Sequence, residues 1–326
     1  MKISCFCEIE FLKRFTNNIP DANPYSSNND FDIWRNFKKL IFENSRLTID
    51  NKNKLTEWVN DNRENKLAVF LFKKIVEIKE MLIDEFDFET INPHTIFFLA
   101  DNKKCKKLEE DYGMLFISNE TQNENSRIIF GFEQSPIPIT KNGKYSNYSF
   151  LNTFHHPCNA MIINDSYLLK EKDDTYNENL IAILDFLLPD NLKKDKFQLL
   201  ILSGDNKTNI DVNSRYLFIK REINKLRTYP IELKIETKEA HHNRDILTNY
   251  LRISVGHKFT LFIKQKATIN DDLTVHSFIG NQSEMEVVND RKNDYRKLEK
   301  DTNNIGSQVV VIPKEQAGKV TNRLLK

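Results

Sequence analysis

The sequence predicts an α/β protein with two domains. Between residues 159 and 236, short apolar runs of strand length alternate with segments that carry apolar residues at helical spacing. Such an alternation of strands and helices is typical of layered α/β domains. The chain has 326 residues, more than the roughly 100–200 residues of one ordinary domain. A polar stretch with little periodicity, residues 121–149, separates the two halves and is expected to be a linker.

The composition indicates a folded chain without an overall charge. Hydrophobic residues make up 39% of the chain, and 23 Phe stand against only 8 Gly, which favours substantial cores and excludes a disordered protein. Lys and Arg number 48 against 47 Asp and Glu. The chain therefore lacks the general positive charge of a nonspecific nucleic-acid binder, and any phosphate-binding surface has to be local.

The sequence also bears on location and on cysteine chemistry. No stretch approaches the roughly 18 apolar residues of a membrane span, and the N-terminus lacks the apolar core of a secretory signal, so we expect a cytoplasmic protein with no membrane span. The four cysteines match neither a disulfide framework nor a paired CxxC zinc site. We expect them to be reduced and mostly buried.

Residues 1–120 are expected to form an N-terminal domain that is mainly helical or α/β. Two apolar stripes at near-helical spacing, one from Phe31 to Ile41 and one from Leu67 to Leu82, predict helices that pack against a core. Gly113 is expected to end a helix. The remaining predicted elements of this half are a strand at 95–99, a helix at 103–111 and a strand at 114–117.

The second domain is expected to span residues 150–283, with a C-terminal extension at 284–326 that begins with a charged helix. Its predicted strands lie at 159–163, 197–202, 231–235, 242–248 and 251–255, and its predicted helices at 180–188 and 213–227. Because side chains alternate along an extended chain, His242 and Arg244 are expected to project from one face of their strand.

The segment 242–249 resembles the signature of the phospholipase D-like superfamily. That signature has a His, a Lys two residues on, an Asp five residues beyond the Lys, and then a Gly-Ser pair. Here His242 matches, Arg244 stands in place of the Lys, Asn249 in place of the Asp, and Gly256-His257 in place of Gly-Ser. Motifs of several other enzyme classes, including the P-loop, the Rossmann glycine pattern, HExxH and GxSxG, are not found in the sequence.

A second piece of the resemblance lies upstream. Residues 162–167, Ile-Ile-Asn-Asp-Ser-Tyr, are similar to the strand end with the pattern I-x-D-P-Y of the same superfamily, and the two pieces occur in the matching order. The resemblance covers residues 150–283. It is most similar to the phospholipase D-like domain of eukaryotic MIT-domain proteins, which has a His-x-Arg segment and is regarded as non-catalytic and phospholipid-associated.

The resemblance implies roles for particular residues. In active members a His attacks the phosphoryl group, a cation neutralises the nonbridging oxygens, and a second His protonates the leaving oxygen. The implied catalytic residues are His242, Arg244 and Asn249, and the implied phosphate-binding residues are His242, Arg244, Gly256 and His257. The chain carries one such half-site, so catalysis would require a homodimer that pairs two copies of His242 across a two-fold axis.

Two functions remain open on the sequence alone. One is a phosphodiester-directed protein, either nuclease-like or sensing a nucleic acid or nucleotide, in the bacterial defence or mobile-element setting where such domains are generally used. The other is a non-catalytic scaffold that binds a phosphate group or a partner protein, because the Arg244 fork suits phosphate binding while the uncharged Asn249 gives an imidazolium less support. A third interpretation makes His241 and His242 a partly buried structural pair at a strand end, with rings that bond to backbone carbonyls.

The N-terminal half has a fainter resemblance, to PIN-like nucleases. Residues 96–117 are similar to the late strand, helix and strand of those proteins, in which an acidic residue at the strand end helps hold a divalent metal. On that interpretation Asp101 would combine with Glu8, Glu10 or Asp50 to bind Mg²⁺ for phosphodiester hydrolysis. The alternative is that Asp101 caps the following helix, a frequent role for Asp, and in that case no metal or cofactor is expected.

Overall fold

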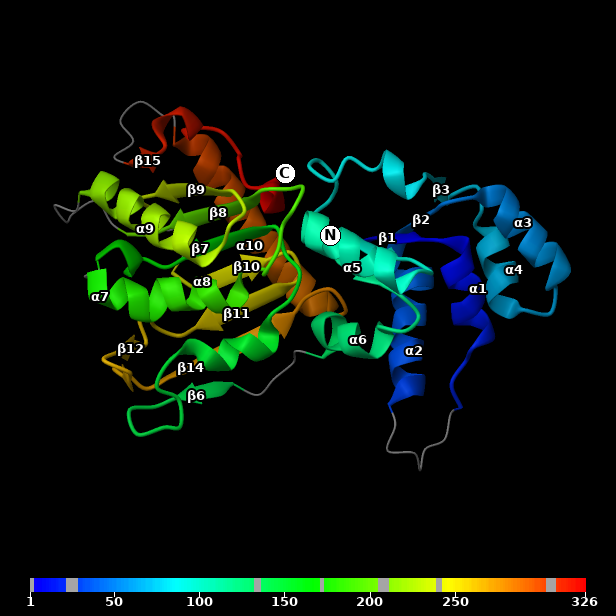
Figure 1. The fold of residues 1–326 in the computed structure, drawn as a ribbon, viewed down its shortest axis with the longest axis horizontal. Helices are drawn as coiled ribbons and strands as arrows, with labels where there is room; N and C mark the ends of the chain where they lie inside the picture. Colours follow the sequence, from blue (N-terminus) through cyan, green and yellow to red (C-terminus); the bar gives the residue numbers. More distant parts are fainter. Residues whose placement is uncertain are drawn as a thin grey trace.

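The computed structural model describes residues 3–21, 29–131, 136–170, 173–204, 211–238, 242–302 and 309–326. Its helices and two main sheets confirm the α/β class, arranged as two units side by side (Figure 1). Within the described residues, no helix combines the length and the apolar character that a bilayer crossing requires. The four cysteines are free and buried, as expected.

The first unit is built on a five-stranded parallel sheet in the order β3-β2-β1-β4-β5. Its strands are β1 (Ile3–Cys7), β2 (Ser45–Ile49), β3 (Lys79–Glu80), β4 (Ile96–Phe98) and β5 (Leu115–Ile117). Its helices are α1 (Ile9–Asn17), α2 (Asp30–Lys39) with a π-helical continuation (Leu40–Asn44), α3 (Lys52–Asp61), α4 (Lys66–Lys73), α5 (Asn102–Tyr112) and α6 (Gln122–Phe130). Of the two forms expected for this half, the α/β form is therefore present.

The predicted elements of this unit are present with one exception. The helix expected from Leu67 to Leu82 ends at Lys73, because the chain then returns to the sheet and residues 79 and 80 pair with the end of β2. Gly113 ends α5 in the left-handed conformation at φ +59°, where a side chain would be strained. A Cβ at Gly113 would also lie 2.5 Å from the carbonyl oxygen of Cys158.

The second unit is built on an eight-stranded mixed sheet in the order β15-β9-β8-β7-β10-β11-β14-β6. Its strands are β6 (Ile137–Ile139), β7 (Ala160–Asn164), β8 (Phe197–Leu202), β9 (Ile231–Glu236), β10 (Arg244–Thr248), β11 (Leu251–Val255), β14 (Asp271–Ser277) and β15 (Val311–Ile312). A separate hairpin consists of β12 (Phe262–Ile263) and β13 (Lys266–Ala267). Strands β7, β8 and β9 are parallel to one another, and β10 runs antiparallel to β7.

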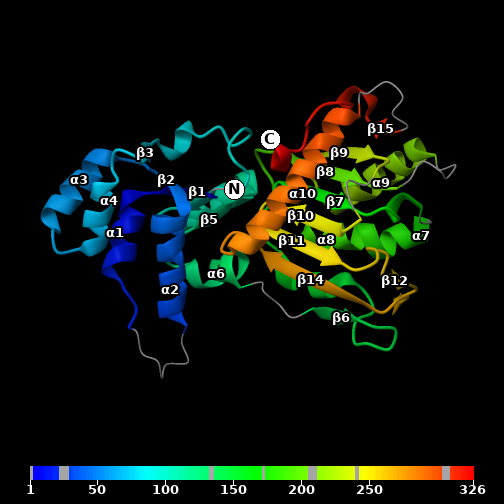
Figure 2. The ribbon, with the colours of Figure 1, turned by 180° about the vertical axis from the view of Figure 1, so that it is seen from behind.

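Helices cover both faces of the second sheet. They are α7 (Asp173–Tyr176), a π-helical segment (Asn177–Ile181), α8 (Ala182–Leu187), α9 (Val212–Leu226) and α10 (Gln282–Asp301). Ile246 of β10 shares a core with Leu184 of α8 and Ile219 of α9. Leu247 shares a different core with Val288 of α10, which lies across the opposite face (Figure 2). Neighbouring residues of β10 therefore point to opposite layers, as the alternation predicted.

Residues 121–149, where we expected a linker, contain α6 and β6. Helix α6 packs against α2 of the first unit, and β6 pairs with β14 as the edge strand of the second sheet. The expected extension at 284–326 contributes the remainder of α10 and also β15, which pairs with β9. The described elements of both stretches thus pack with the two units.

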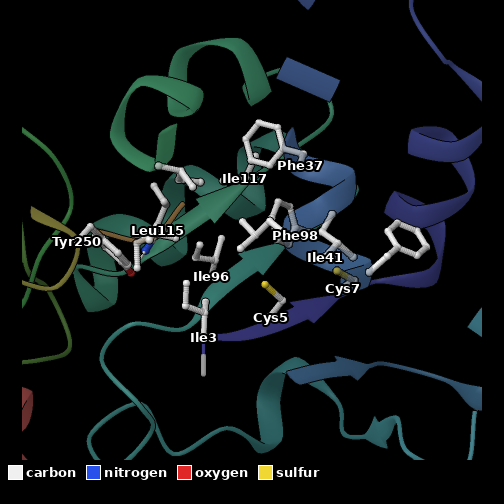
Figure 3. Close-up of a cluster of buried hydrophobic side chains, with 14 of the residues drawn as sticks. Ile3, Cys5, Cys7, Phe37, Ile41, Ile96, Phe98, Leu115, Ile117 and Tyr250 are labelled. Carbon is white, nitrogen blue, oxygen red and sulfur yellow. Dashed lines mark hydrogen bonds between the residues drawn. The ribbon is translucent and has the colours of Figure 1, made fainter. Parts of the chain in front are cut away.

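The two units share a buried, hydrogen-bonded interface. The hydroxyl of Tyr250, in the turn between β10 and β11, accepts a hydrogen bond from Leu115 N at 2.8 Å and donates one to Thr95 O at 3.2 Å. Figure 3 shows Tyr250 beside Leu115 and Ile96 of the first sheet. His94 adds a second link, because its Nδ1 contacts the carbonyl oxygen of Asn249 at 2.5 Å. One core cluster accordingly includes residues of both units.

Candidate phosphate-binding site

One edge of the second sheet brings together most of the residues that the signature singled out. Strand β7 ends there at Asn164, and the antiparallel β10 begins there at Arg244. Strand β11 also ends at this edge, because Arg244 pairs with Val255. Ligands of open α/β sheets bind outside the carboxyl ends of the parallel strands, and this is such an edge. We call it the Arg244 edge.

Arg244 is half-buried, and its contacts there are with uncharged groups. Its guanidinium carbon lies 5.4 Å from the centroid of the Tyr167 ring, and Nη2 lies 3.5 Å from the hydroxyl oxygen of Ser166. Nη1 donates to the carbonyl oxygen of His242. Nε is buried without a partner. Within the described part of the chain no carboxylate oxygen lies within 4.0 Å of this guanidinium. Its positive charge is therefore available to bind an anion.

Asp165 positions the backbone around Arg244. It directly follows β7 and is completely buried. Its carboxylate accepts hydrogen bonds from Tyr167 N at 2.9 Å and from Phe259 N at 2.6 Å, which joins the end of β7 to the loop after β11. Burial raises the pKa of Asp165 to about 6, although these hydrogen bonds and the charges of Arg244 and Lys258 lower it in part.

His242 is exposed at this edge, and His241, its neighbour in the alternative structural interpretation, lies outside the described residues. The neighbouring residue Asn243 is held from both sides. Its carbonyl oxygen accepts from Asn164 Nδ2 at 2.6 Å, and its amide, oriented to satisfy both groups, accepts from Arg291 Nη1 at 3.2 Å. The backbone next to His242 is therefore fixed, while the imidazole faces outward.

A charged network on the opposite face of β10 supports this arrangement. Asp245 is buried and contacts Arg252 Nη1 at 3.0 Å and Arg291 Nε at 3.4 Å. Arg252 is also bound by Glu284, whose Oε2 accepts from Nε at 3.0 Å and from Nη2 at 2.9 Å. These pairs tie β10 and β11 to α10, because Glu284 and Arg291 lie on that helix. The network holds β10 in place without using Arg244.

Gly256 and His257 lie at the same edge but bind a side chain of the protein through their backbone. The N–H groups of Gly256 and His257 donate to the two carboxylate oxygens of Asp271, at 3.1 and 2.8 Å. They are thus occupied, and a phosphate could not use them without displacing Asp271. The exposed His257 side chain remains at the edge.

Asn249 lies at the other end of β10 and is a structural residue of the domain interface. Five residues of extended chain separate it from Arg244 by about 17 Å. Its Oδ1 accepts from Asn159 N at 3.0 Å and Ala160 N at 3.2 Å, and its Nδ2 donates to Pro93 O at 2.8 Å. The amide is completely buried and satisfied by the protein. The structure therefore separates Asn249 from the other residues of the expected catalytic set.

The proposed metal ligands of the first unit are each engaged elsewhere. Asp101 caps α5, accepting from Lys103 N at 2.8 Å and Lys104 N at 3.3 Å, as the alternative interpretation expected. Glu8 binds Ala100 N and Lys104 Nζ, Asp50 accepts from Ile9 N, and Glu10 pairs with Lys13. Across the described ranges, no group of three or more His, Cys, Asp or Glu residues is arranged to hold a metal ion. The residues present do not form a Mg²⁺ site.

Neither the models of known protein families nor the curated proteins compared with this chain give a match. The Arg244 edge must therefore be judged by its own geometry. Asp165 belongs to the segment 162–167 that the sequence resemblance singled out, where it matches the Asp of the pattern. Arg291 was not predicted, because it lies in a helix rich in charged residues where no pattern distinguishes it from the other charged residues.

Proposed function

We propose that this protein is phosphodiester-directed and binds a phosphate group of a nucleic acid or nucleotide at the Arg244 edge. The observation that carries the proposal is the environment of the Arg244 guanidinium. It is stacked on an aromatic ring, bonded to neutral oxygens, and has no carboxylate within ion-pair distance in the described part of the chain. A fixed, planar cation of this kind binds phosphate oxygens through two parallel hydrogen bonds.

The arrangement favours binding over turnover by a single chain. His242 and Arg244 supply one nucleophile and one cation, while hydrolysis by the route that the resemblance implies also needs a second imidazole as an acid. Asn249 cannot orient His242, because it lies about 17 Å beyond Arg244, past the opposite end of β10 from His242. Tyr167 has 43% of its surface exposed beside Arg244, so a base can stack near the bound phosphate.

The proposal is tested by oligonucleotide binding. Fluorescence anisotropy with a labelled single-stranded oligonucleotide is expected to show binding that Arg244→Gln weakens by about tenfold, the loss of one charge-assisted contact. Arg221→Gln is the matched control, since Arg221 is an exposed arginine on α9 of the same unit. Equal affinities for the wild type and Arg244→Gln would refute the proposal, as would no binding by the wild type at low salt.

Hydrolysis by a dimer is the second candidate, and the exposed position of His242 at the sheet edge favours it. A two-fold partner docked on this edge would supply the missing imidazole. If this candidate is right, light scattering on the purified protein is expected to show a dimer. The nuclease activity is expected to be lost in His242→Ala and to survive a metal chelator. A monomer, or equal activity in His242→Ala, rules out this two-histidine mechanism while leaving phosphate binding by Arg244 intact.

A further inference from the structure

A cleft lies at the free edge of the first sheet, away from the Arg244 edge. It has a volume of about 880 Å³ and lies around β2. Strand β3 pairs with β2 only at Thr48 and Ile49. The preceding residues, Ser45 to Leu47, pair with β1 on one side and have no strand neighbour on the other side in the described part of the chain. This end of the sheet is therefore open to ligands.

The register shows which side chains share a face at this edge. Ser4 pairs with Arg46, Phe6 pairs with Thr48, and Thr48 pairs with Lys79. Paired residues of a parallel sheet point to the same side, and so do residues two apart along a strand. All five side chains thus lie on one face. It is the face of Phe97, which pairs with Phe6 and belongs to the same hydrophobic cluster.

That face is covered unevenly. Over β4 and β5 it packs against Cys105 and Leu108 of α5. Over β1 and β2 the covering chain is the segment 81–95, whose helical content is one 3₁₀ turn (Ile83–Glu85). Parallel sheets usually have helices over both faces. The cleft opens beside this thin cover and continues round the edge of β2 to the opposite face, where Ile41, Phe42 and Lys74 line it.

The lining on this face has a cationic part and an apolar part. Arg46 and Lys79 are exposed, and no carboxylate lies within 4.0 Å of either among the residues that the structure describes. The Thr48 hydroxyl neighbours Lys79 across β2 and β3, and the Ser4 hydroxyl neighbours Arg46 on the β1 side. Phe86 and Ile91, both half-buried, supply the apolar part from the segment 81–95. Of the two acidic residues that line the cleft, Glu80 is paired with Ile49 and so points to the opposite face, and Glu77 is exposed in the turn that precedes β3.

We propose that this cleft is a binding site for a nucleoside phosphate, with the phosphate held by Arg46 and Lys79 and the base placed against Phe86 and Ile91. The cleft as a whole, which extends over both faces of this edge, has the volume of a small-molecule site and exceeds the need of a phosphate ion alone. Two cations without a carboxylate partner, each beside a hydroxyl, suit a phosphate, and an aromatic wall suits a planar ring. The site is independent of the Arg244 edge.

Titration calorimetry with AMP, adenosine and inorganic phosphate tests the proposal. AMP is expected to bind, and adenosine and phosphate are each expected to bind at least about tenfold more weakly, because each retains half of the contacts. Arg46→Gln and Lys79→Gln should each weaken AMP binding by about tenfold. Both residues are exposed, so the variants should fold. Lys107→Gln, an exposed lysine on α5 outside the cleft, should bind AMP like the wild type.

Arg244→Gln separates the two sites. It should leave AMP affinity unchanged, since Arg244 does not line the cleft. AMP binding that is lost in Arg244→Gln and retained in Arg46→Gln would overturn the cleft site. Binding of an extended acidic peptide but not of AMP would also overturn it, and would identify the free edge of β2 as a surface for strand addition instead.

Discussion

His94 shows how one buried side chain makes the stability of the whole protein depend on pH. Its ring is completely buried between the two units, with Nδ1 donating to Asn249 O and Nε2 accepting from Lys292 Nζ at 3.0 Å. Burial, aided by the Lys292 charge, lowers the pKa of His94 to about 3. The imidazole is therefore neutral in the folded state at pH values well above 3.

The sign of the effect follows from proton linkage. Below about pH 6.5 the unfolded chain protonates this histidine and the folded chain does not, so the free energy of unfolding falls as the pH falls. Between about pH 7.5 and about pH 5.5 His94 should account for a loss of about 1.4 kcal/mol. Urea unfolding of His94→Gln at the two pH values should show a drop smaller by that amount. Equal drops in variant and wild type would contradict the burial of a neutral ring.

Asn249 yields a second prediction at the residue scale. Asn249→Asp restores the residue of the active phospholipase D-like signature, yet it places a carboxylate oxygen against the acceptor oxygens of Pro93 and Asn159. We expect a destabilisation of about 3–5 kcal/mol, because a buried charge then has one oxygen that faces two acceptors and no donor. Thermal unfolding measures it. A variant that keeps wild-type stability and gains phosphodiesterase activity would show that Asn249 belongs to a catalytic site after all.

At the scale of elements, α5 separates the capping role of Asp101 from a metal-binding role. Asp101→Ala removes the acceptor for two backbone N–H groups at the start of the helix and should cost about 1 kcal/mol of stability. Asp101→Asn keeps an acceptor and should cost less. Chemical denaturation compares the three proteins. A metal site would instead give a stability that depends on added Mg²⁺ in the wild type and not in either variant.

At the scale of the whole molecule, residues 323–325 join the buried core that the two units share. Arg323 forms a buried ion pair with Asp195, with Nη2 and Oδ1 2.8 Å apart, and the next two residues, Leu324 and Leu325, are completely buried in the core shared by the two units. Arg323→Ala leaves the Asp195 carboxylate buried without its partner and should cost about 3–5 kcal/mol.

A double variant serves as the control for this prediction. Replacing both Asp195 and Arg323 by Leu removes the two charges together, so its cost should be smaller than that of Arg323→Ala. Equal or larger destabilisation in the double variant would show that the tail is held by packing and that the ion pair contributes little. The same unfolding experiment measures both variants.

The sequence by itself determined the elements with strong periodicity. Of the candidate site, it determined that Arg244 lies on a strand and which face of the strand it occupies. Strands β7, β8 and β9 follow from apolar runs and helix α2 from an apolar stripe at helical spacing, and Gly113 ends α5 as its type predicts. Alternation along 242–248 placed Arg244 and Asp245 on opposite faces. Local pattern is sufficient there, because each element buries one face against a nearby layer.

Tertiary structure alone decided the rest. Strand β1 is a short buried run without alternation, so only its pairing with β2 and β4 identifies it as a strand. The signature placed Asn249 with His242, but the extended geometry of β10 carries Asn249 to the domain interface. The contacts of Arg244 come from Ser166 and Tyr167, nearly eighty positions earlier in the chain. Contacts across such separations depend on how the strands are ordered in the sheet, which no local pattern of residues specifies.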